Sequence, residues 1–251
     1  MSNLAIGIDI GGTGIKAAVV DLDTGTLATE RRRLLTPQPA LPKAVAKTVA
    51  RLFEQEELRA PQLVGAGFPA VVKDGVALTA ANVDKSWIGT NVAETIGAAI
   101  GRTVTAFNDA DAAGLAELRF GAGKDVRGMV AMITLGTGIG CALFLNGTLV
   151  PNTELGHIQI RGKDAERRAA ASVRERKKLT WKEWSGRVEE YLNALDALIW
   201  PDLIIIGGGV SATPEKFIPR LQCRPKVVAA TLGNDAGIIG AALHAAEAGT
   251  Q

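Results

Sequence analysis

Two segments far apart in the chain share one pattern. Residues 6–21 read IGIDIGGTGIKAAVVD, and residues 131–147 read AMITLGTGIGCALFLNG. Each segment is an apolar run, a short turn of glycine and threonine, and a second apolar run, which is typical of two strands joined by a tight turn. The repetition predicts an internal duplication and therefore two lobes, although one pair of matches does not separate duplication from coincidence.

The rest of the chain alternates between strand-like and helix-like segments, which is typical of an α/β protein. Further strands are predicted at 63–68, 103–107 and 203–206, and helices at 41–53, 92–100, 109–120, 181–195 and 237–248. We expect a small N-terminal lobe of residues 1–109, onto which a C-terminal helix at 237–251 packs back. Residues 110–236 are expected to form a larger C-terminal lobe.

The composition excludes several classes of protein. A chain of 251 residues, 47% hydrophobic and 22% charged, can bury a large core and is not disordered. Its net charge of +2 gives no support for a nucleic-acid partner. Cys141 and Cys223 are far apart in the sequence and indicate no disulfide framework. We find no targeting segment and no apolar run near the ~20 residues of a membrane span, so we expect a cytoplasmic protein without a membrane partner.

Three glycine-rich turns follow apolar strands, at 11–14, 136–138 and 207–209. Glycine lets backbone N–H groups converge on an anion without a Cβ in the way, and a threonine hydroxyl adds a donor. One such turn is most often an ordinary tight turn, but three at strand ends favour phosphate binding. No Gly-x-x-x-x-Gly-Lys-Ser/Thr motif occurs, and the glycines from residue 136 lead into a strand rather than a helix, which excludes P-loop and dinucleotide-binding folds.

Two aspartates lie where predicted strands end. Asp109 is at the edge of the sheet at which α/β folds bind ligands, and a carboxylate there can accept the proton of a substrate hydroxyl. It can also cap the helix that follows, which is the role we favour for Asp111. Asp9 is either a turn former or a residue that reaches Mg²⁺ through water.

The segment Glu154-Leu155-Gly156-His157 places a carboxylate and an imidazole three residues apart. Neither cysteine is near His157, so the segment is a poor metal site. Paired acceptors and donors of this kind suit the hydroxyl groups of a sugar, whereas a structural, hydrogen-bonded histidine is the alternative interpretation.

Together these motifs resemble the ROK family of sugar kinases and repressors. The resemblance rests on Asp9-x-Gly11-Gly12-Thr13-x-x-Lys16, Asn108-Asp109, the segment 135–140 and Glu154-Leu155-Gly156-His157. It implies the actin/hexokinase-like ATPase fold, built from duplicated ribonuclease-H-like domains, whose two lobes close a cleft over the sugar and the phosphoryl donor. A homodimer is also what the family resemblance implies.

The resemblance also implies roles for individual residues. Asp109 would be the catalytic base for the 6-hydroxyl group of the sugar, and Asp9 would contact Mg²⁺ through water. The sugar would be held by Asn82, Asn108, Asp109, Glu154, His157 and Glu166. The phosphates and the nucleotide would be bound by Asp9, Gly11, Gly12, Thr13, Lys16, Thr134, Gly136, Thr137, Gly138, Gly208 and Gly209.

One departure from the family is informative. Most members carry a cysteine-rich zinc loop directly after Glu-x-Gly-His, and this chain has no cysteine there, so we expect no bound zinc. The sequence GKDAE at 162–166, followed by a basic helix and a Trp-x-x-Trp segment, resembles the polyphosphate glucokinase branch of the family. That branch phosphorylates glucose, and in one glucomannokinase also mannose, with inorganic polyphosphate and sometimes ATP.

The charge pattern agrees with this branch. Residues 161–178 hold eight basic residues against three acidic ones, in a chain whose net charge is +2. A polyanion bound by many basic residues gains from counterion release, but an ordinary solvated helix face explains the pattern equally well. The residues we assign to polyphosphate are Arg161, Lys163, Arg167, Arg168, Lys177 and Lys178.

The expected function is therefore that of a sugar kinase. It would transfer a phosphoryl group from inorganic polyphosphate, and from ATP, to the 6-hydroxyl of glucose, with mannose as a further substrate. The alternatives are an ATP-only ROK hexokinase and a non-catalytic, sugar-binding regulator. Regulators of this family carry an N-terminal helix-turn-helix, and the strand predicted to begin at Leu4 leaves no room for one.

Overall fold

The computed structural model describes residues 3–249, which form two compact units. Unit 1 contains the chain up to Ala116 and again from Asp235, and unit 2 is the continuous stretch Glu117–Asn234. The boundaries predicted from the sequence lie after residues 109 and 236 instead. The first boundary differs because helix α3 (Asp109–Phe120) continues without a break past the residue at which the units divide.

The sheet of unit 1 has the strand order β3-β2-β1-β5-β8, with β4 also paired to β2. Strands β1 and β2 form the predicted antiparallel hairpin, whereas β5 and β8 run parallel to β1. The carboxyl ends of β1, β5 and β8 therefore share one edge of the sheet. The strands are β1 (Leu4–Ile10), β2 (Gly14–Asp21), β3 (Thr26–Leu27), β4 (Arg32–Leu35), β5 (Val64–Phe68) and β8 (Thr105–Asn108).

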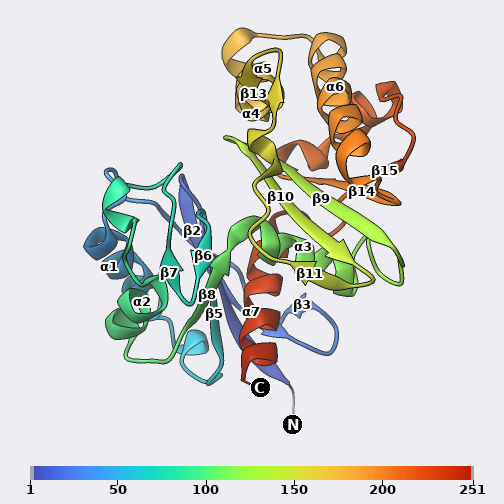
Figure 1. Ribbon diagram of the computed structural model, residues 1–251. Helices are drawn as coiled ribbons and strands as arrows, with labels where there is room; N and C mark the ends of the chain where they lie inside the picture. The colour runs from blue at the N-terminus through green and yellow to red at the C-terminus, as the bar shows by residue number, and fades with distance from the viewer. Residues whose placement is uncertain (1–2, 250–251) are drawn as a thin grey trace. The chain divides into compact units, whose positions relative to one another are not determined.

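Helices cover both faces of this sheet (Figure 1). Helices α1 (Pro42–Leu52) and α2 (Val92–Ile100) bury their apolar stripes against Ile6 and Ile8 of β1. Both helices begin and end within one residue of the predicted ranges. Pro42 occupies the first turn of α1, and Gly101 ends α2 with a φ of 68°, a conformation that favours glycine.

Helix α7 (Ala236–Ala248) packs on the opposite face, and glycines allow a very close approach. A Cβ at Gly7 would collide with the carbonyl oxygen of Ile238, and a Cβ at Gly65 would collide with that of Ala241. Gly240 of α7 lies equally close to the carbonyl oxygen of Ala112 in α3. The backbones of α7, the sheet and α3 are therefore in direct contact, with no side chain between them.

Unit 2 repeats the arrangement of unit 1. Its sheet has the order β11-β10-β9-β14-β15, in which β9 and β10 form an antiparallel hairpin and β14 runs parallel to β9. A hairpin with a glycine turn followed by a parallel strand thus occurs in both units, so the predicted duplication is confirmed. The strands are β9 (Met129–Leu135), β10 (Ile139–Leu145), β11 (Thr148–Val150), β14 (Leu203–Gly207) and β15 (Lys226–Ala229).

Helix α6 (Trp181–Ile199) covers one face of this second sheet. It begins with a complete capping box, in which Thr180 and Glu183 each bond the other's backbone N–H. Trp184, Tyr191 and Leu195 of α6 are fully buried against strand residues such as Ile133 and Ile204. Among residues 3–249, α6 and the shorter helices include none that is both long and apolar enough to cross a membrane.

The basic segment is not the single helix that the sequence predicts. It forms two short helices, α4 (Glu166–Ala169) and α5 (Ala171–Lys177), separated by Ala170 in an extended conformation. The break leaves the carbonyl oxygens of Ala169 and Ala170 free to accept the indole N–H of Trp184, at 3.0 and 3.3 Å. The break therefore supplies the acceptors that a buried indole N–H needs.

Several small elements carry no signal that the sequence analysis used. Two short hairpins are β6 (Val72–Lys73) with β7 (Val76–Ala77) and β12 (Gln159–Ile160) with β13 (Lys163–Asp164). The 3₁₀ helices are Glu56–Leu58, Lys85–Trp87, Leu155–His157, Gly209–Ala212, Pro214–Lys216, Ile218–Arg220 and Gly233–Asp235.

Glu117 is a fully buried carboxylate at the start of unit 2. It accepts hydrogen bonds from the backbone N–H groups of Thr231 at 2.9 Å, Leu232 at 2.7 Å and Ala122 at 2.8 Å. A buried carboxyl group is costly unless it is hydrogen-bonded, and both oxygen atoms of Glu117 accept hydrogen bonds. Glu117, the first residue of unit 2, is thereby bonded to Thr231 and Leu232, which lie near the last residue of the unit.

The close packing of α7 predicts that Gly65→Ala destabilises the protein. The new methyl group meets a backbone carbonyl, which cannot move aside, so we expect a loss of about 1–3 kcal/mol in the free energy of unfolding. Gly186→Ala is the control, because Gly186 lies in α6 with open space around it and should gain roughly 0.5–1 kcal/mol. Urea titrations of both variants measure the difference, and equal stabilities would contradict the packing.

Tyr191→Phe is expected to stabilise unit 2. The Tyr191 hydroxyl is buried and has no hydrogen-bond partner among the described residues, and burial, with Cys141 nearby, raises its pKa well above the usual value. Removing an unsatisfied buried hydroxyl should add about 1 kcal/mol to the free energy of unfolding. Trp184→Phe, which removes an indole N–H that is bonded, should destabilise instead. A Tyr191→Phe variant less stable than the parent would contradict this.

Candidate active site

The two aspartates of unit 1 lie beside one glycine at the shared edge of the parallel strands. The strand register places Asp9 of β1 next to Gly67 of β5. A Cβ at Gly67 would lie 3.5 Å from the Cα atom of Asp109, the first residue of α3. The structure therefore brings together two carboxylates that are a hundred residues apart in the sequence.

The Asp9 carboxylate is paired and half-enclosed. The Nζ atom of Lys16 donates to its Oδ2 atom at 2.7 Å, and both side chains are mostly shielded from water, with exposures of 16% and 23%. A Cβ at Gly237 would lie 3.1 Å from the Asp9 Cγ, so the first turn of α7 also adjoins this carboxylate. The positive end of a helix favours an anionic group at this place.

The 11–13 turn has its carbonyl groups held by later parts of the chain. Thr36 donates its hydroxyl to the carbonyl of Gly11 at 2.5 Å, and Gln38 donates its amide to that of Gly12 at 3.1 Å. The backbone of Asn82 lies against Gly12, where a Cβ would meet the Asn82 carbonyl oxygen at 3.1 Å. With its carbonyls engaged, the turn can offer its N–H groups to an anion.

Asn108 is the residue that caps α3. Its Oδ1 atom accepts the N–H groups of Ala110 at 2.8 Å and Asp111 at 3.0 Å, and its Nδ2 atom donates to the carbonyl of Ala70 at 3.0 Å. The interpretation of Asp111 as the cap is therefore wrong. Capping by Asn108 fixes the backbone at Asp109, which is half-buried.

The 136–138 turn of unit 2 is held in the same way. Ser172, near the start of α5, donates its hydroxyl to the carbonyl of Thr137 at 2.7 Å and its N–H to that of Gly136 at 3.0 Å. Thr134, at the end of β9, pairs in register with Gly207 of β14. The two glycine turns of the duplicated hairpins therefore share their mode of support, in which later side chains hold the turn carbonyls.

Gly208 lies directly against this turn. Its φ is 83°, and a Cβ would meet the backbone of Leu135 within 3 Å, so both conformation and space require glycine here. Gly209 begins a 3₁₀ helix in open space. Two of the three glycine segments predicted to bind phosphate or nucleoside thus adjoin each other in unit 2.

Four polar side chains gather next to the same turn. The Nε2 atom of His157 lies 3.4 Å from the Oε2 atom of Glu154, and its Nδ1 atom lies 3.7 Å from the Oδ2 atom of Asp164. A Cβ at Gly138 would lie 2.5 Å from the Oε2 atom of Glu166, which places Glu166 over the turn. The structure therefore brings Glu154, His157 and Glu166 together and adds Asp164, whereas their role in holding a sugar stays a prediction.

Burial raises the pKa of the Glu154 carboxyl above its ordinary value of 4.5. The nearby imidazole of His157 opposes this shift, and the Glu166 carboxylate adds to it. His157, Asp164 and Glu166 each offer an atom within 4.8 Å of the others, an arrangement of nitrogen and oxygen ligands without a cysteine. The absence of zinc stays a prediction, which elemental analysis can test.

Only part of the basic segment is free of acidic partners. Arg161 and Arg168 both bind the Glu190 carboxylate, at 2.5 and 2.6 Å, and Arg167 lies 3.7 Å from Asp164. Lys163, Lys177 and Lys178 form no ion pair within residues 3–249. The six residues assigned to polyphosphate are therefore not equivalent.

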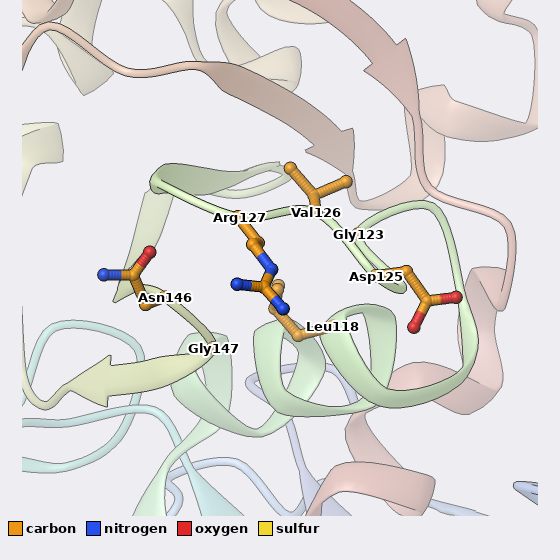
Figure 2. A pocket seen from close by; sticks show the side chains of 7 residues that line it. All are labelled: Leu118, Gly123, Asp125, Val126, Arg127, Asn146 and Gly147. Atoms are coloured by element: carbon orange, nitrogen blue, oxygen red, sulfur yellow. The ribbon is translucent and has the colours of Figure 1, made fainter.

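A pocket of about 280 Å³ lies elsewhere in unit 2 (Figure 2). Figure 2 shows the Arg127 side chain between those of Asp125 and Asn146. Arg127 precedes β9 and Asn146 follows β10, whereas the 136–138 turn joins the other ends of these strands. A strand of this length spans roughly 20 Å, so the pocket is separate from the glycine turn.

The duplicated hairpins with glycine turns, followed by parallel strands, define the hexokinase-like ATPase fold. The ROK family model matches residues 5–170, and the chain belongs to the ROK family.

Three known proteins are similar over nearly the whole chain. The polyphosphate glucokinase of Mycobacterium tuberculosis is 56% identical over 238 residues, which are 94% of this chain and 89% of that protein. The inorganic polyphosphate/ATP-glucomannokinase of Arthrobacter sp. strain KM is 49% identical, with a TM-score of 0.93 over 98% and 99% of the two chains. A ROK family glucokinase from Streptomyces griseus, solved with glucose and AMPPNP, is 25% identical, with a TM-score of 0.85 over 98% and 100%.

Sequence reasoning missed the residues that support the site. Thr36, Gln38 and Ser172 hold the glycine turns through hydrogen bonds to residues at least 25 positions away. Isolated serine, threonine and glutamine residues carry no local pattern that would single them out. The helix start near Ser172 is no signal either, because it follows from the break at Ala170.

The raised pKa of Glu154 predicts a pH-dependent stability difference. Below the ordinary value of 4.5 the carboxyl is protonated in both folded and unfolded chains, and no penalty exists. As the pH rises through the raised folded-state pKa, the folded protein loses stability because a partly buried carboxyl must ionise. Glu154→Gln should therefore be more stable than the parent at pH 7, and the gap should close below pH 4.5 in melting temperatures. A gap that widens toward acid would contradict the shift.

Proposed function

We propose that this protein transfers a phosphoryl group from inorganic polyphosphate, and from ATP, to the 6-hydroxyl of glucose. The observation that carries the proposal is the similarity over nearly the whole chain to a polyphosphate glucokinase and a polyphosphate/ATP-glucomannokinase. The arrangement of carboxylates in unit 1 and of glycine turns in both units is consistent with this chemistry.

Asp109 is proposed as the general base. Phosphoryl transfer needs a residue that accepts the proton of the attacking hydroxyl, and otherwise depends on positioning and charge stabilisation. Asp109 is half-buried at the first position of α3, and the cap by Asn108 holds it there. Asn82, Glu154, His157 and Glu166 are proposed to hold the sugar hydroxyls, with Asn108 acting through its remaining amide N–H.

The phosphoryl donor is proposed to bind the glycine turns. The N–H groups of Thr13 and Thr137 donate no hydrogen bond among residues 3–249. The hydrogen bonds from other parts of the chain go to the carbonyl groups of both turns instead. Lys16 and Thr134 add donors close to the turns, and Gly208 and Gly209 are proposed to border the nucleoside of ATP.

Mg²⁺ is proposed to act next to Asp9. One oxygen of this carboxylate is engaged by Lys16, so the residue fits contact through water better than enclosure of the ion. When bound, Mg²⁺ neutralises charge on the transferring phosphoryl group. The side chains of Asp9 and Lys16 orient each other at the end of β1.

Two further expectations stay proposals. Mannose is proposed as a second substrate because of the 49% identity with a glucomannokinase. A homodimer rests on the family resemblance stated above, and sedimentation of the purified protein tests it.

A panel of donors tests the proposed function. Purified protein with glucose and Mg²⁺ should form glucose 6-phosphate from polyphosphate of several lengths and from ATP. Activity with ATP alone would replace the proposal by an ATP-only hexokinase. Glucose binding without turnover on any donor would instead support a sugar-binding regulator.

Asp109→Asn is expected to lower turnover by at least ~10²–10⁴-fold, because the amide keeps the shape of the carboxylate but cannot accept a proton. Glucose binding, measured by calorimetry on the same sample, should change little. Asp125→Asn, at an exposed aspartate in the pocket of Figure 2, is the matched control and should keep full turnover. An Asp109→Asn variant within threefold of the parent would remove Asp109 from its assigned role.

A further inference from the structure

The guanidinium group of Arg174 has no anionic partner in the described part of the chain. Its Cζ atom lies 3.7 Å from the centre of the Trp181 ring. Its Nε atom is buried and makes no hydrogen bond. Neither the adjacent Glu175 nor any other acidic residue among 3–249 forms an ion pair with Arg174. A guanidinium whose face stacks on an indole can still offer its terminal N–H groups to a phosphate.

Lys216 brings a second cation to the same indole ring. Its Nζ atom lies 5.6 Å from the centre of the Trp181 ring, and the side chain is exposed. Phe217 stacks on Trp181 at 6.2 Å with an interplanar angle of 16°, which fixes the ring between α6 and the segment that follows Gly209. Two cations from elements 42 positions apart in the sequence thus adjoin one rigid aromatic platform.

This platform is connected to the 136–138 turn through α5. Ser172 bonds the turn with both its hydroxyl and its N–H, and Arg174 lies two residues further along the same short helix. At about 1.5 Å per residue, that places the Arg174 backbone only ~3 Å further along the helix axis than Ser172. Arg176 and Lys177 complete the helix and Lys178 follows it, and all three form no ion pair among residues 3–249.

The other part of the basic segment differs in its pairing. Arg161 and Arg168 share the Glu190 carboxylate, and the bonds to these arginines lower the pKa of Glu190. A phosphate that binds these arginines has to compete with a carboxylate already in place. The unpaired cations are instead those on the α5 side, near Trp181.

We propose that Arg174 and Lys216, on the Trp181 platform, form a subsite for phosphates of the polyphosphate chain beyond those held at the 136–138 turn. The proposal rests on the proposed function, since it assigns the distal part of the same donor. It replaces Arg161, Arg167 and Arg168 as the main distal contacts. ATP, which has three phosphates and a nucleoside, has no further phosphate to place there.

The test compares Arg174→Gln and Lys216→Gln with Lys226→Gln, which removes an exposed, unpaired lysine of the same unit on β15. Each of the first two variants should raise the KM for long polyphosphate about tenfold, the effect of one lost charge-assisted hydrogen bond. The kcat at saturation should stay near the parent value because a distal contact binds ground state and transition state alike. The KM for ATP should stay within about twofold of the parent, and Lys226→Gln should match the parent with both donors.

Salt dependence and direct binding give independent readouts. Each variant should reduce the slope of log affinity against log salt for long polyphosphate by roughly one. Calorimetric binding of polyphosphate without glucose should weaken in parallel, and Arg174→Lys should recover part of the affinity. Melting temperatures identify a variant that is merely unfolded, and Lys216, which is exposed, keeps the test decisive if Arg174→Gln does not fold.

The outcomes separate this inference from the proposed function. If the parent uses polyphosphate but the two variants keep their KM for it, or lose ATP and polyphosphate use equally, the subsite is overturned and the function stands. If the parent neither binds nor uses polyphosphate, the proposed function fails and the subsite fails with it. A selective loss for long chains over ATP supports the subsite.

Discussion

The contact on which unit 1 depends is the direct backbone packing of α7 against β1, β5 and α3. Gly7, Gly65 and Gly240 allow it, because any Cβ at these positions would collide with a carbonyl group. The same packing brings Gly237 up to the Asp9 carboxylate and holds α3 so that Asp109 lies over Gly67. The placement of the Asp9 and Asp109 backbones at this edge therefore depends on the absence of side chains at a few positions.

Much of the fold could be predicted because its determinants are local. The two hairpins follow from apolar runs around glycine turns, and helix ends follow from residues such as Pro42, Gly101 and Thr180. The break at Ala170 could not be predicted, because it satisfies an indole donor that arrives from another helix. The same holds for Glu117, whose three backbone donors come from segments up to 115 positions away.

The sequence predicts the chemical groups of the candidate site better than the residues that hold them in place. The motifs that contain Asp9, Asp109, Glu154 and His157 stand out because the polar residues of each motif are close together in the sequence. In the basic segment, the net charge counted from the sequence overstates the positive charge that a ligand can reach, because some of the arginines are paired with acidic residues. Glu190, outside the segment, neutralises two of its arginines, whereas Lys216, also outside it, adds a cation.

The insertion of unit 2 before α7 also sets the order in which the two units can be completed during synthesis. Unit 2 is one continuous stretch inserted between the two parts of unit 1, so the ribosome makes all of it before it makes α7. At about 5–20 residues per second, the nascent sheet of unit 1 waits roughly 10 s with its glycine-lined face uncovered. By the end of that interval unit 2 has every strand and helix of its own core and can fold first. The half of the protein that is translated first is thus the half that is completed last.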